Sequence, residues 1–177
     1  RARYDAWRRP RKEAAMLDRN LEVDLNAQMD REFFSSYLYL AMAAHFENEN
    51  LGGMGTWMRR QADEEREHAM KFFDFILDRG AMVRLGPIEA PPEKFGTPLE
   101  VFEQALDHER EVTAAINGLF EHADRATEVF LHWFATEQVE EERSVEQIVD
   151  ALKMAGDSGA ALLMLDRELG ARGAGGA

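Results

Sequence analysis

The chain has 177 residues, of which 45% are hydrophobic and 31% are charged, and its formal net charge is −13. This length suffices for one domain with a buried core, whereas the absence of cysteine excludes disulfides, Fe–S clusters and thiolate metal sites. The acidic excess argues against nucleic acid as a partner, because neutralising phosphates requires a basic face. The longest apolar run, residues 37–44, is too short to cross a membrane. These features predict a globular protein of the cytoplasm.

Both ends of the chain differ in composition from the part between them. Six of the first 15 residues are Lys or Arg, and Met16 resembles a natural start. Residues 1–16 are therefore interpreted as a flexible basic extension, with a short amphipathic targeting arm as the alternative. Residues 171–177 are rich in Gly and Ala, which predicts a disordered tail. The folded domain is expected over residues 17–170.

Four long segments of this domain have apolar residues spaced three or four positions apart, which is typical of amphipathic helices. The predicted helices are Leu17–Asn48, Gly55–Arg79, Pro98–His122 and Arg125–Ala155. Residues 48–53 include two consecutive glycines and are predicted as a turn, while Thr97 before Pro98 predicts a capped helix start. A short apolar fifth helix is expected after Gly156 and ends near Leu169.

The lengths of the connections predict how these helices are arranged. The first and third connections are short, so the helices that they join should lie antiparallel. The second connection, residues 81–97, contains three prolines and no helical period. Fully extended it reaches roughly 55 Å, enough to run back along a helix of roughly 38 Å. The expected fold is therefore an all-α four-helix bundle with one long crossover between its second and third helices.

Each of the four predicted helices carries a glutamate in the middle of its apolar stripe. These glutamates are Glu32, Glu65, Glu109 and Glu141. His68 follows Glu65 by one turn, Gln138 precedes Glu141 by one turn, and Tyr39 and Leu40 continue the first stripe. A single glutamate on such a face usually reaches solvent through its flexible stem.

Four buried carboxylates together would need protonation, bases or metal ions, because a low-dielectric core disfavours unpaired charge. No Lys or Arg lies on the four stripes, whereas two divalent cations would balance the four negative charges. An oxygen-rich ligand set with one imidazole suits iron, and manganese fits the same ligands. Di-iron carboxylate bundles contribute one Glu from each of two helices and Glu-x-x-His from each of the other two. The fourth helix departs from this pattern, with Gln138 and Glu141 in place of the second Glu-x-x-His.

Over residues 17 to about 170 the chain resembles prokaryotic non-haem ferritins. The resemblance rests on four groups of residues: Leu25-Asn26 with Glu32, Ser35-Ser36 and Tyr39; residues 59–65 with His68; His108-Glu109; and Trp133 with Glu137-Gln138 and Glu140-Glu141. It implies a ferritin-like bundle that oxidises Fe(II) with O2 or peroxide and stores ferric mineral inside a cage of 24 subunits. No nucleic acid or membrane is implied as a partner.

The resemblance also implies a role for each site residue. Glu32, Glu65 and His68 match the ligands of a first iron, with Glu65 bridging to a second iron that Glu109 and Glu141 complete. Gln138 matches a residue close to the oxygen-binding face. The match to a third iron site comprises Glu64, Glu137 and Glu140, which could instead form an exposed acidic surface. Tyr39 matches a tyrosine that supplies an electron, and a tyrosine of the core is the alternative.

Related families fit the sequence less well. Bacterioferritins carry a second Glu-x-x-His and a haem-ligating Met after the bridging Glu, where this chain has Glu141 and Arg66, so no haem is expected. Rubrerythrins need a four-cysteine iron site, and miniferritins lack the fifth helix. Here the apolar face of that helix must pack on its own bundle or, as the resemblance favours, on symmetry mates around a four-fold axis. A metal-free structural bundle is the alternative from another class.

Overall fold

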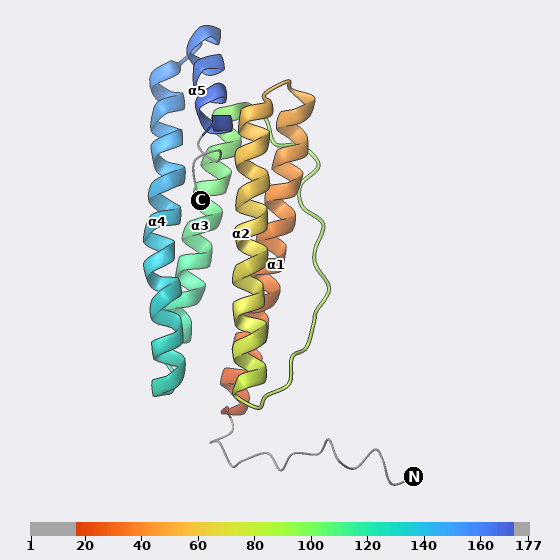
Figure 1. Ribbon diagram of the computed structural model, residues 1–177, viewed down its shortest axis with the longest axis vertical. Helices are drawn as coiled ribbons and strands as arrows, with labels where there is room; N and C mark the ends of the chain where they lie inside the picture. The colour runs from red at the N-terminus through yellow and green to blue at the C-terminus, as the bar shows by residue number, and fades with distance from the viewer. Residues whose placement is uncertain (1–16, 172–177) are drawn as a thin grey trace.

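The computed structural model describes residues 17–171 and, over these residues, consists of five α-helices without strands. The helices are α1 (Arg19–Asn48), α2 (Gly52–Asp78), α3 (Pro98–Leu119), α4 (Arg125–Ala155) and α5 (Gly159–Ala171). The first four form an elongated bundle, and α5 lies at one end of it (Figure 1). The predicted all-α fold is thus confirmed. The predicted extension, residues 1–16, lies outside the described residues, and so does the predicted tail except for Ala171, which still belongs to α5.

Side-chain caps explain where three of the helices begin. The Asp18 carboxylate accepts a hydrogen bond from the Asn20 backbone N–H at the start of α1. Thr97 and Glu100 form a reciprocal capping box at the start of α3, with Pro98 in its first turn. Asp124 accepts from the Thr127 backbone N–H, 2.9 Å away, and α4 therefore starts at the predicted residue.

The turn between α1 and α2 is shorter than predicted. Helix α2 begins at Gly52 instead of Gly55, and the reversal is completed by Asn50, whose φ is 61°. Gly53 lies inside the helix, and a glycine is needed there because α5 packs against it. A Cβ atom at this position would lie 1.7 Å from the Asp166 backbone oxygen. Gly53 therefore reflects a close helix contact, and the chain reversal depends on Asn50 instead. At the other end, α3 stops at Leu119, three residues before the predicted limit at His122.

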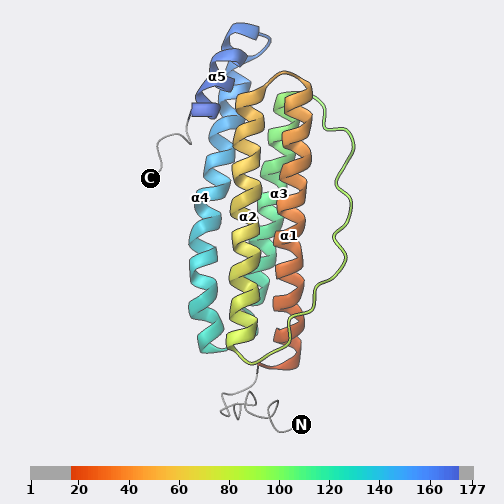
Figure 2. The same ribbon diagram turned by 45° about the vertical axis from the view of Figure 1, so that its right-hand side comes forward.

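The long connection after α2 crosses the full length of the bundle. It runs along α1 from one end to the other, so that α2 and α3 point in the same direction (Figure 2). Side chains of α1 hold it in place: the Asn26 amide donates to the Met82 carbonyl and accepts from the Arg84 N–H, and Asp30 accepts from the Gly86 N–H. The predicted parallel crossover is thus observed.

Buried hydrophobic side chains form two clusters, one toward each end of the bundle. The cluster at the end with the α1–α2 turn is called the upper cluster and includes Phe46 and Phe102. The lower cluster, at the end where α1 begins, includes Phe72 and Phe134. Between them lies a layer of buried polar side chains at the middle of the helices. The prediction that Leu40 faces this core is wrong: Leu40 is 46% exposed, and Leu38 is buried instead.

Helix α5 buries its apolar face against its own chain. Leu165 and Leu169 belong to the upper cluster and are buried there, so at these two positions the helix packs on its own bundle, which is one of the two predicted arrangements. The Asp166 carboxylate also accepts a hydrogen bond from the Met54 backbone N–H, 2.9 Å away, at the start of α2. None of the helices described in residues 17–171 is long and apolar enough to span a membrane.

Candidate metal centre

The polar layer at mid-bundle contains the six residues that the sequence predicted as the core of a metal site. None is more than 7% exposed: Glu32, Glu65, His68, Glu109, Gln138 and Glu141. They come from all four long helices, because each helix turns its buried face toward the same point of the bundle. The structure therefore brings together residues that are more than one hundred positions apart in the chain.

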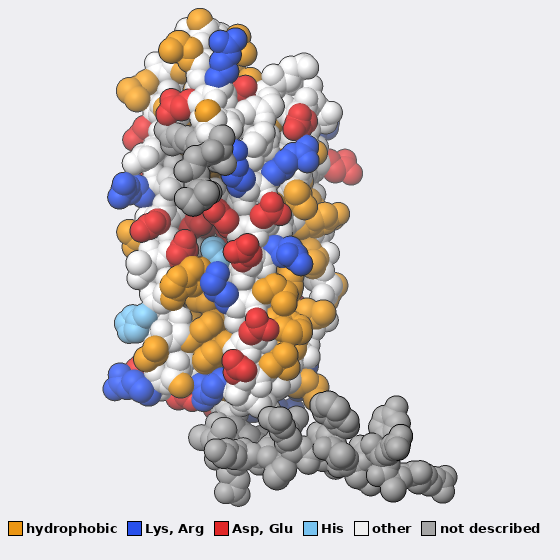
Figure 3. Space-filling model, in the orientation of Figure 1, with side chains coloured by type: hydrophobic (Ala, Val, Ile, Leu, Met, Phe, Trp, Pro, Cys, Tyr) orange, Lys and Arg blue, Asp and Glu red, His pale blue; other side chains and the backbone are white. Residues whose placement is uncertain are grey.

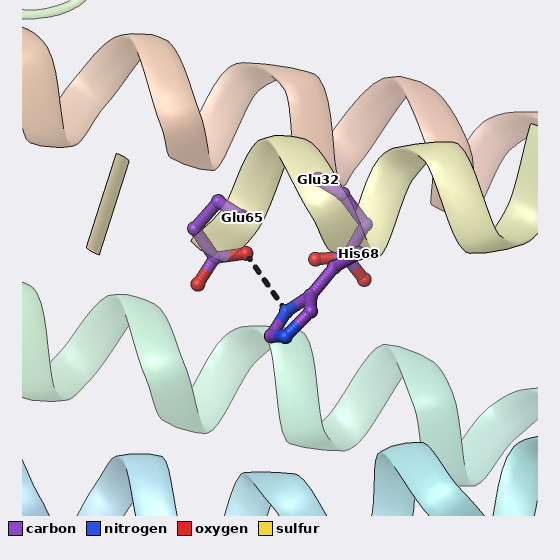
Figure 4. A group of neighbouring side chains, drawn as sticks. All are labelled: Glu32, Glu65 and His68. Carbon is purple, nitrogen blue, oxygen red and sulfur yellow. Dashed lines mark ion pairs between the residues drawn. The ribbon is translucent and has the colours of Figure 1, made fainter. Parts of the chain in front are cut away.

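Glu32, Glu65 and His68 form the tightest group of this layer. Their ligand atoms all lie within 4.8 Å of one another. Figure 4 shows the three side chains projecting from α1 and α2 toward α3 and α4, with the Glu65 Oε2 atom 3.5 Å from His68 Nδ1. The carboxyl groups of Glu32 and Glu65 share a hydrogen bond, which requires a proton on one of them. Gln28 donates a second hydrogen bond, of 2.7 Å, to Glu32.

One oxygen of Glu65 indicates that this group suits a cation. Glu65 Oε2 is buried and accepts no hydrogen bond, and it is the one such side-chain atom among the described residues. An unsatisfied buried carboxylate oxygen costs several times the net value of a normal hydrogen bond. A cation between Glu65, Glu32 and His68 would satisfy this oxygen and replace the shared proton. The residues present therefore fit a hard divalent or trivalent metal ion.

Glu109 lies across the layer, on α3, and is held by two side chains. The Tyr39 hydroxyl donates a short hydrogen bond to Glu109 Oε1, and Gln138 Nε2 lies 3.2 Å from Glu109 Oε2. Gln138 also donates to Thr113 Oγ1 over 3.2 Å. Tyr39 is fully buried. Tyr39 is thus both a buried residue of the core and a hydrogen-bond donor to a candidate metal ligand, so its position fits either of the two predicted roles.

Glu141 connects the layer to a second group of ligand atoms. Atoms of His68, Glu137 and Glu141 also lie within 4.8 Å of one another. Gln61 donates to Glu141 over 3.0 Å and to Glu64 over 2.9 Å, and so links these two carboxylates. Glu140 is exposed and belongs to neither group. Acidic side chains gather over the middle of α2 and α4, on the face shown in Figure 3.

Burial shifts the pKa values of the site residues toward their neutral forms. Loss of solvent raises the pKa of Glu32 to about 7 and that of Glu141 to about 8, with further contributions from neighbouring carboxylates. The pKa values of Glu65 and Glu109 are raised for the same reason. Burial lowers the pKa of His68 to about 4, so its imidazole is neutral at pH 7 and free to bind a metal ion.

Three residues near the site were not predicted as part of it. Gln28 and Gln61 hydrogen-bond to site carboxylates, and each precedes a site glutamate by four positions on the same helix face. This spacing is a signal that the sequence already contained. Trp133 lies edge-on to the His68 imidazole, with ring centroids 5.3 Å apart. Its proximity depends on how α2 and α4 pack, which spacing within one helix does not reveal.

The bundle and its buried layer define a class of protein, namely four-helix bundles whose core contains a layer of carboxylates and histidine able to hold a metal ion. The family model described as a ferritin-like domain matches residues 23–155. A bacterial non-heme ferritin of Bacteroides fragilis is 41% identical over 161 residues, which cover 89% of this chain and 100% of the relative. One of Staphylococcus aureus is 42% identical and covers 89% of this chain and 97% of the relative.

Solved structures agree with these relatives. An open pore ferritin from Archaeoglobus fulgidus superposes with a TM-score of 0.86 at 44% identity, covering 87% of this chain and 98% of that one. A closed form of the same ferritin, engineered by site-directed mutagenesis, also has a TM-score of 0.86, at 45% identity and with 87% of this chain and 96% of that one covered. The chain belongs to the ferritin family, and its bacterial relatives are non-haem ferritins.

Proposed function

We propose that this chain oxidises Fe(II) at the buried layer between its four helices and stores the ferric product inside a cage of identical subunits. The observation that carries the proposal is the unsatisfied Glu65 Oε2 atom, which lies 3.5 Å from His68 Nδ1 and close to Glu32, in a buried layer of the described residues that contains no Lys or Arg. Membership of the ferritin family supports iron as the cation. Ligand chemistry alone also allows manganese.

The site residues are proposed to act as follows. Glu32, Glu65 and His68 bind one Fe(II), Glu65 also contacts a second, and Glu109 and Glu141 complete the second position. Gln138 orients the Glu109 carboxylate, because it donates to it over 3.2 Å. Tyr39 hydrogen-bonds to Glu109 and is thus placed to supply an electron or simply to position that ligand. Glu64, Glu137 and Glu140 are proposed to hold a third iron on the way to the α2/α4 surface.

The reaction balances without a resident cofactor, because iron itself is the substrate. Two Fe(II) ions each lose one electron, and one O2 takes up both electrons and two protons to become hydrogen peroxide. If peroxide is the oxidant, the same two electrons and two protons convert it to two water molecules. Fe(III) then hydrolyses to ferric oxyhydroxide and releases protons. The protein supplies negative charge, ligand positions and a dry site.

Exposed apolar side chains support assembly into a homo-oligomer. They lie along α1 and the crossover that covers it, and they include Tyr37, Leu40, Leu85 and Ile88. An apolar surface of this kind usually marks a protein–protein interface. The acidic α2/α4 face would then be turned toward the interior of the cage, where cations collect. We expect 24 subunits and a location in the cytoplasm, as for the ferritins that the sequence resembles.

The proposal is tested with Glu65→Ala and His68→Ala. Each variant should lose at least about a hundredfold in the initial rate of Fe(II) oxidation, because each removes a ligand of the first metal position. The matched control is Glu67→Ala, which changes an exposed glutamate in the same turn of α2. Initial rates in both variants that equal the control's rate would refute the assignment of the site.

Storage and the metal-free alternative are separated by a second experiment. The protein is loaded with Fe(II) without oxygen and then given a pulse of O2, while absorbance and particle mass are recorded together. A ferritin should bind about two or three Fe(II) per chain and then gain mass as mineral forms. A structural bundle should show no saturable binding and no increase in mass.

A further inference from the structure

The α2/α4 surface beside the candidate metal centre carries two chemically different groups of side chains, here called walls. One wall is acidic and contains Glu64, Glu137 and Glu141, of which Glu137 and Glu141 share a ligand group with His68. The other contains Lys71 and Trp133. Figure 3 shows this contrast on one face: acidic side chains gather over the middle of α2 and α4, and hydrophobic and basic ones lie further along toward the α4 N-terminus.

Lys71 is held on this surface by an aromatic ring. Its ammonium nitrogen lies 4.1 Å from the centroid of Trp133. Within residues 17–171, no ion pair joins Lys71 to a carboxylate, although this surface is strongly acidic. A cation above an aromatic face is attracted by the negative charge density of the ring. Lys71 therefore keeps its positive charge unneutralised beside the site.

The same ring also contacts the metal-ligand candidate His68. The imidazole lies edge-on to Trp133, with an interplanar angle of 78°, and His68 is only 4% exposed. Lys71 follows His68 by three positions, so both side chains leave α2 on the same face. Trp133 thus covers the imidazole on this side, while the ammonium of Lys71 covers Trp133.

We propose that Lys71 and Trp133 form a closure that repels cations, so that divalent ions exchange with the metal centre only along the acidic wall at Glu137. This inference rests on the proposed function, since it concerns the route by which Fe(II) reaches that site. The pair excludes cations in two ways: the indole fills the space beside His68, and the fixed positive charge opposes an approaching cation. Lys71 is a specificity-determining residue in this scheme and does not touch the metal.

The proposal predicts that Lys71 and Glu137 are coupled. With Lys71 in place, the acidic wall is the only route, so Glu137→Gln should slow cation loading about tenfold at low ionic strength. When Lys71→Gln opens the second route, the same Glu137→Gln change should slow loading by no more than about twofold. The coupling should weaken as salt is added, because screening reduces the repulsion by Lys71.

The experiment measures loading without oxidation chemistry. Anaerobic Co(II) is mixed rapidly with the assembled protein, and binding is followed by the visible absorbance of the bound ion. The four proteins of the cycle are wild type, Lys71→Gln, Glu137→Gln and the double variant. Lys71→Arg is the matched control, because arginine retains the charge and binds an aromatic face; it should behave as wild type. Trp133→Phe weakens the ring and should act in the same direction as Lys71→Gln.

The outcomes separate this inference from the proposed function. Loading rates in which the Lys71 and Glu137 effects simply multiply would overturn the closure, as would a Lys71→Arg variant that behaves like Lys71→Gln. In both cases the wild type still binds Co(II) and oxidises iron, so the proposed function stands. If the wild type binds no Co(II), both fail together. Helical circular dichroism of each variant shows that a changed rate does not reflect unfolding.

Discussion

Several carboxyl groups of the candidate metal centre retain their protons to higher pH than they would in water. Glu32 and Glu141 have pKa values of about 7 and 8, mainly because burial disfavours their charged forms. Without a cation the layer must therefore retain protons near neutral pH, as the hydrogen bond between the carboxyls of Glu32 and Glu65 illustrates. Binding of a divalent ion should release those protons.

This protonation makes the metal-free protein less stable as the pH rises. A carboxyl whose pKa is higher in the folded chain binds more protons there than in the unfolded chain, so the raised carboxyls lower the free energy of unfolding between about pH 4.5 and pH 8; together they outweigh His68, whose lowered pKa acts in the opposite sense below about pH 6.5. We expect a total loss on the order of a few kcal/mol across this range. Thermal unfolding at pH 5, 7 and 8 after chelation measures it, and saturating Co(II) should abolish most of the trend. A metal-free protein that gains stability toward pH 8 would contradict the prediction.

At the scale of helices, the contact between α2 and α5 depends on two glycines, Gly53 and Gly170. A Cβ atom on Gly53 would lie 1.7 Å from the Asp166 backbone oxygen. A Cβ atom on Gly170 would lie 3.1 Å from the Gly53 Cα atom. Backbone atoms cannot move aside like the end of a flexible side chain. The two helices can therefore pack this closely only because both positions lack a side chain.

Gly53→Ala should displace α5 and destabilise the chain by about 2 kcal/mol or more, because the added methyl group overlaps backbone. Gly52→Ala is the matched control: it lies in the same turn, and nothing lies within 4 Å of its Cβ position. That change should leave the stability unaltered or raise it by up to about 1 kcal/mol. Chemical denaturation of both variants makes the comparison, and equal stabilities would show that α5 is not packed as described.

Most of the helix arrangement could be predicted because it depends on local periodicity and on connection length. The four glutamates were identified for the same reason, since each interrupts an apolar stripe of its own helix. Leu40 was misplaced because Leu38 and Leu40, two residues apart, lie on nearly opposite faces of α1, and the sequence does not show which of these apolar faces the partner helices cover. The glycines at 52 and 53 were predicted as a turn because a close approach of a distant helix leaves the same residue type as a chain reversal.

Contacts that cross between helices were the least predictable part of the metal centre. Gln61 of α2 links Glu64 and Glu141 across two helices, and Trp133 of α4 contacts His68 of α2. Such neighbours depend on how far each helix is rotated about its own axis. The spacing of apolar residues fixes that rotation only to within about one residue. A hydrogen bond between two helices requires the rotation to be known more accurately than this.

At the scale of the whole molecule, the side formed by α1 and the crossover exposes apolar side chains that nothing within one subunit covers over the described residues. Leu85 is 67% exposed, yet the crossover around it is held firmly by Asn26 and Asp30. An ordered apolar surface of this kind is suited to a partner subunit. The subunit can therefore present this surface without first ordering a loop.

Leu85→Glu should weaken assembly, because it places an unpaired charge in the proposed interface. We expect particles much smaller than wild type in light scattering, with unchanged helical circular dichroism and unchanged Co(II) binding per chain. Glu89→Gln is the control, since it alters an exposed polar residue of the same crossover and should assemble normally. If Leu85→Glu assembles as wild type does, this surface is not the interface.

The four long helices form two hairpin halves, α1 with α2 and α3 with α4, and the polar layer draws its residues from both. The helices of each hairpin pack closely; between the hairpins, α1 and α3 come within 8 Å of each other, whereas the Cα atoms of α2 and α4 do not, over the described residues. Ions held between Glu65 on one hairpin and Glu109 or Glu141 on the other would cross-link these halves. Bound iron would then make the subunit more rigid, and a subunit without iron would be the more flexible one.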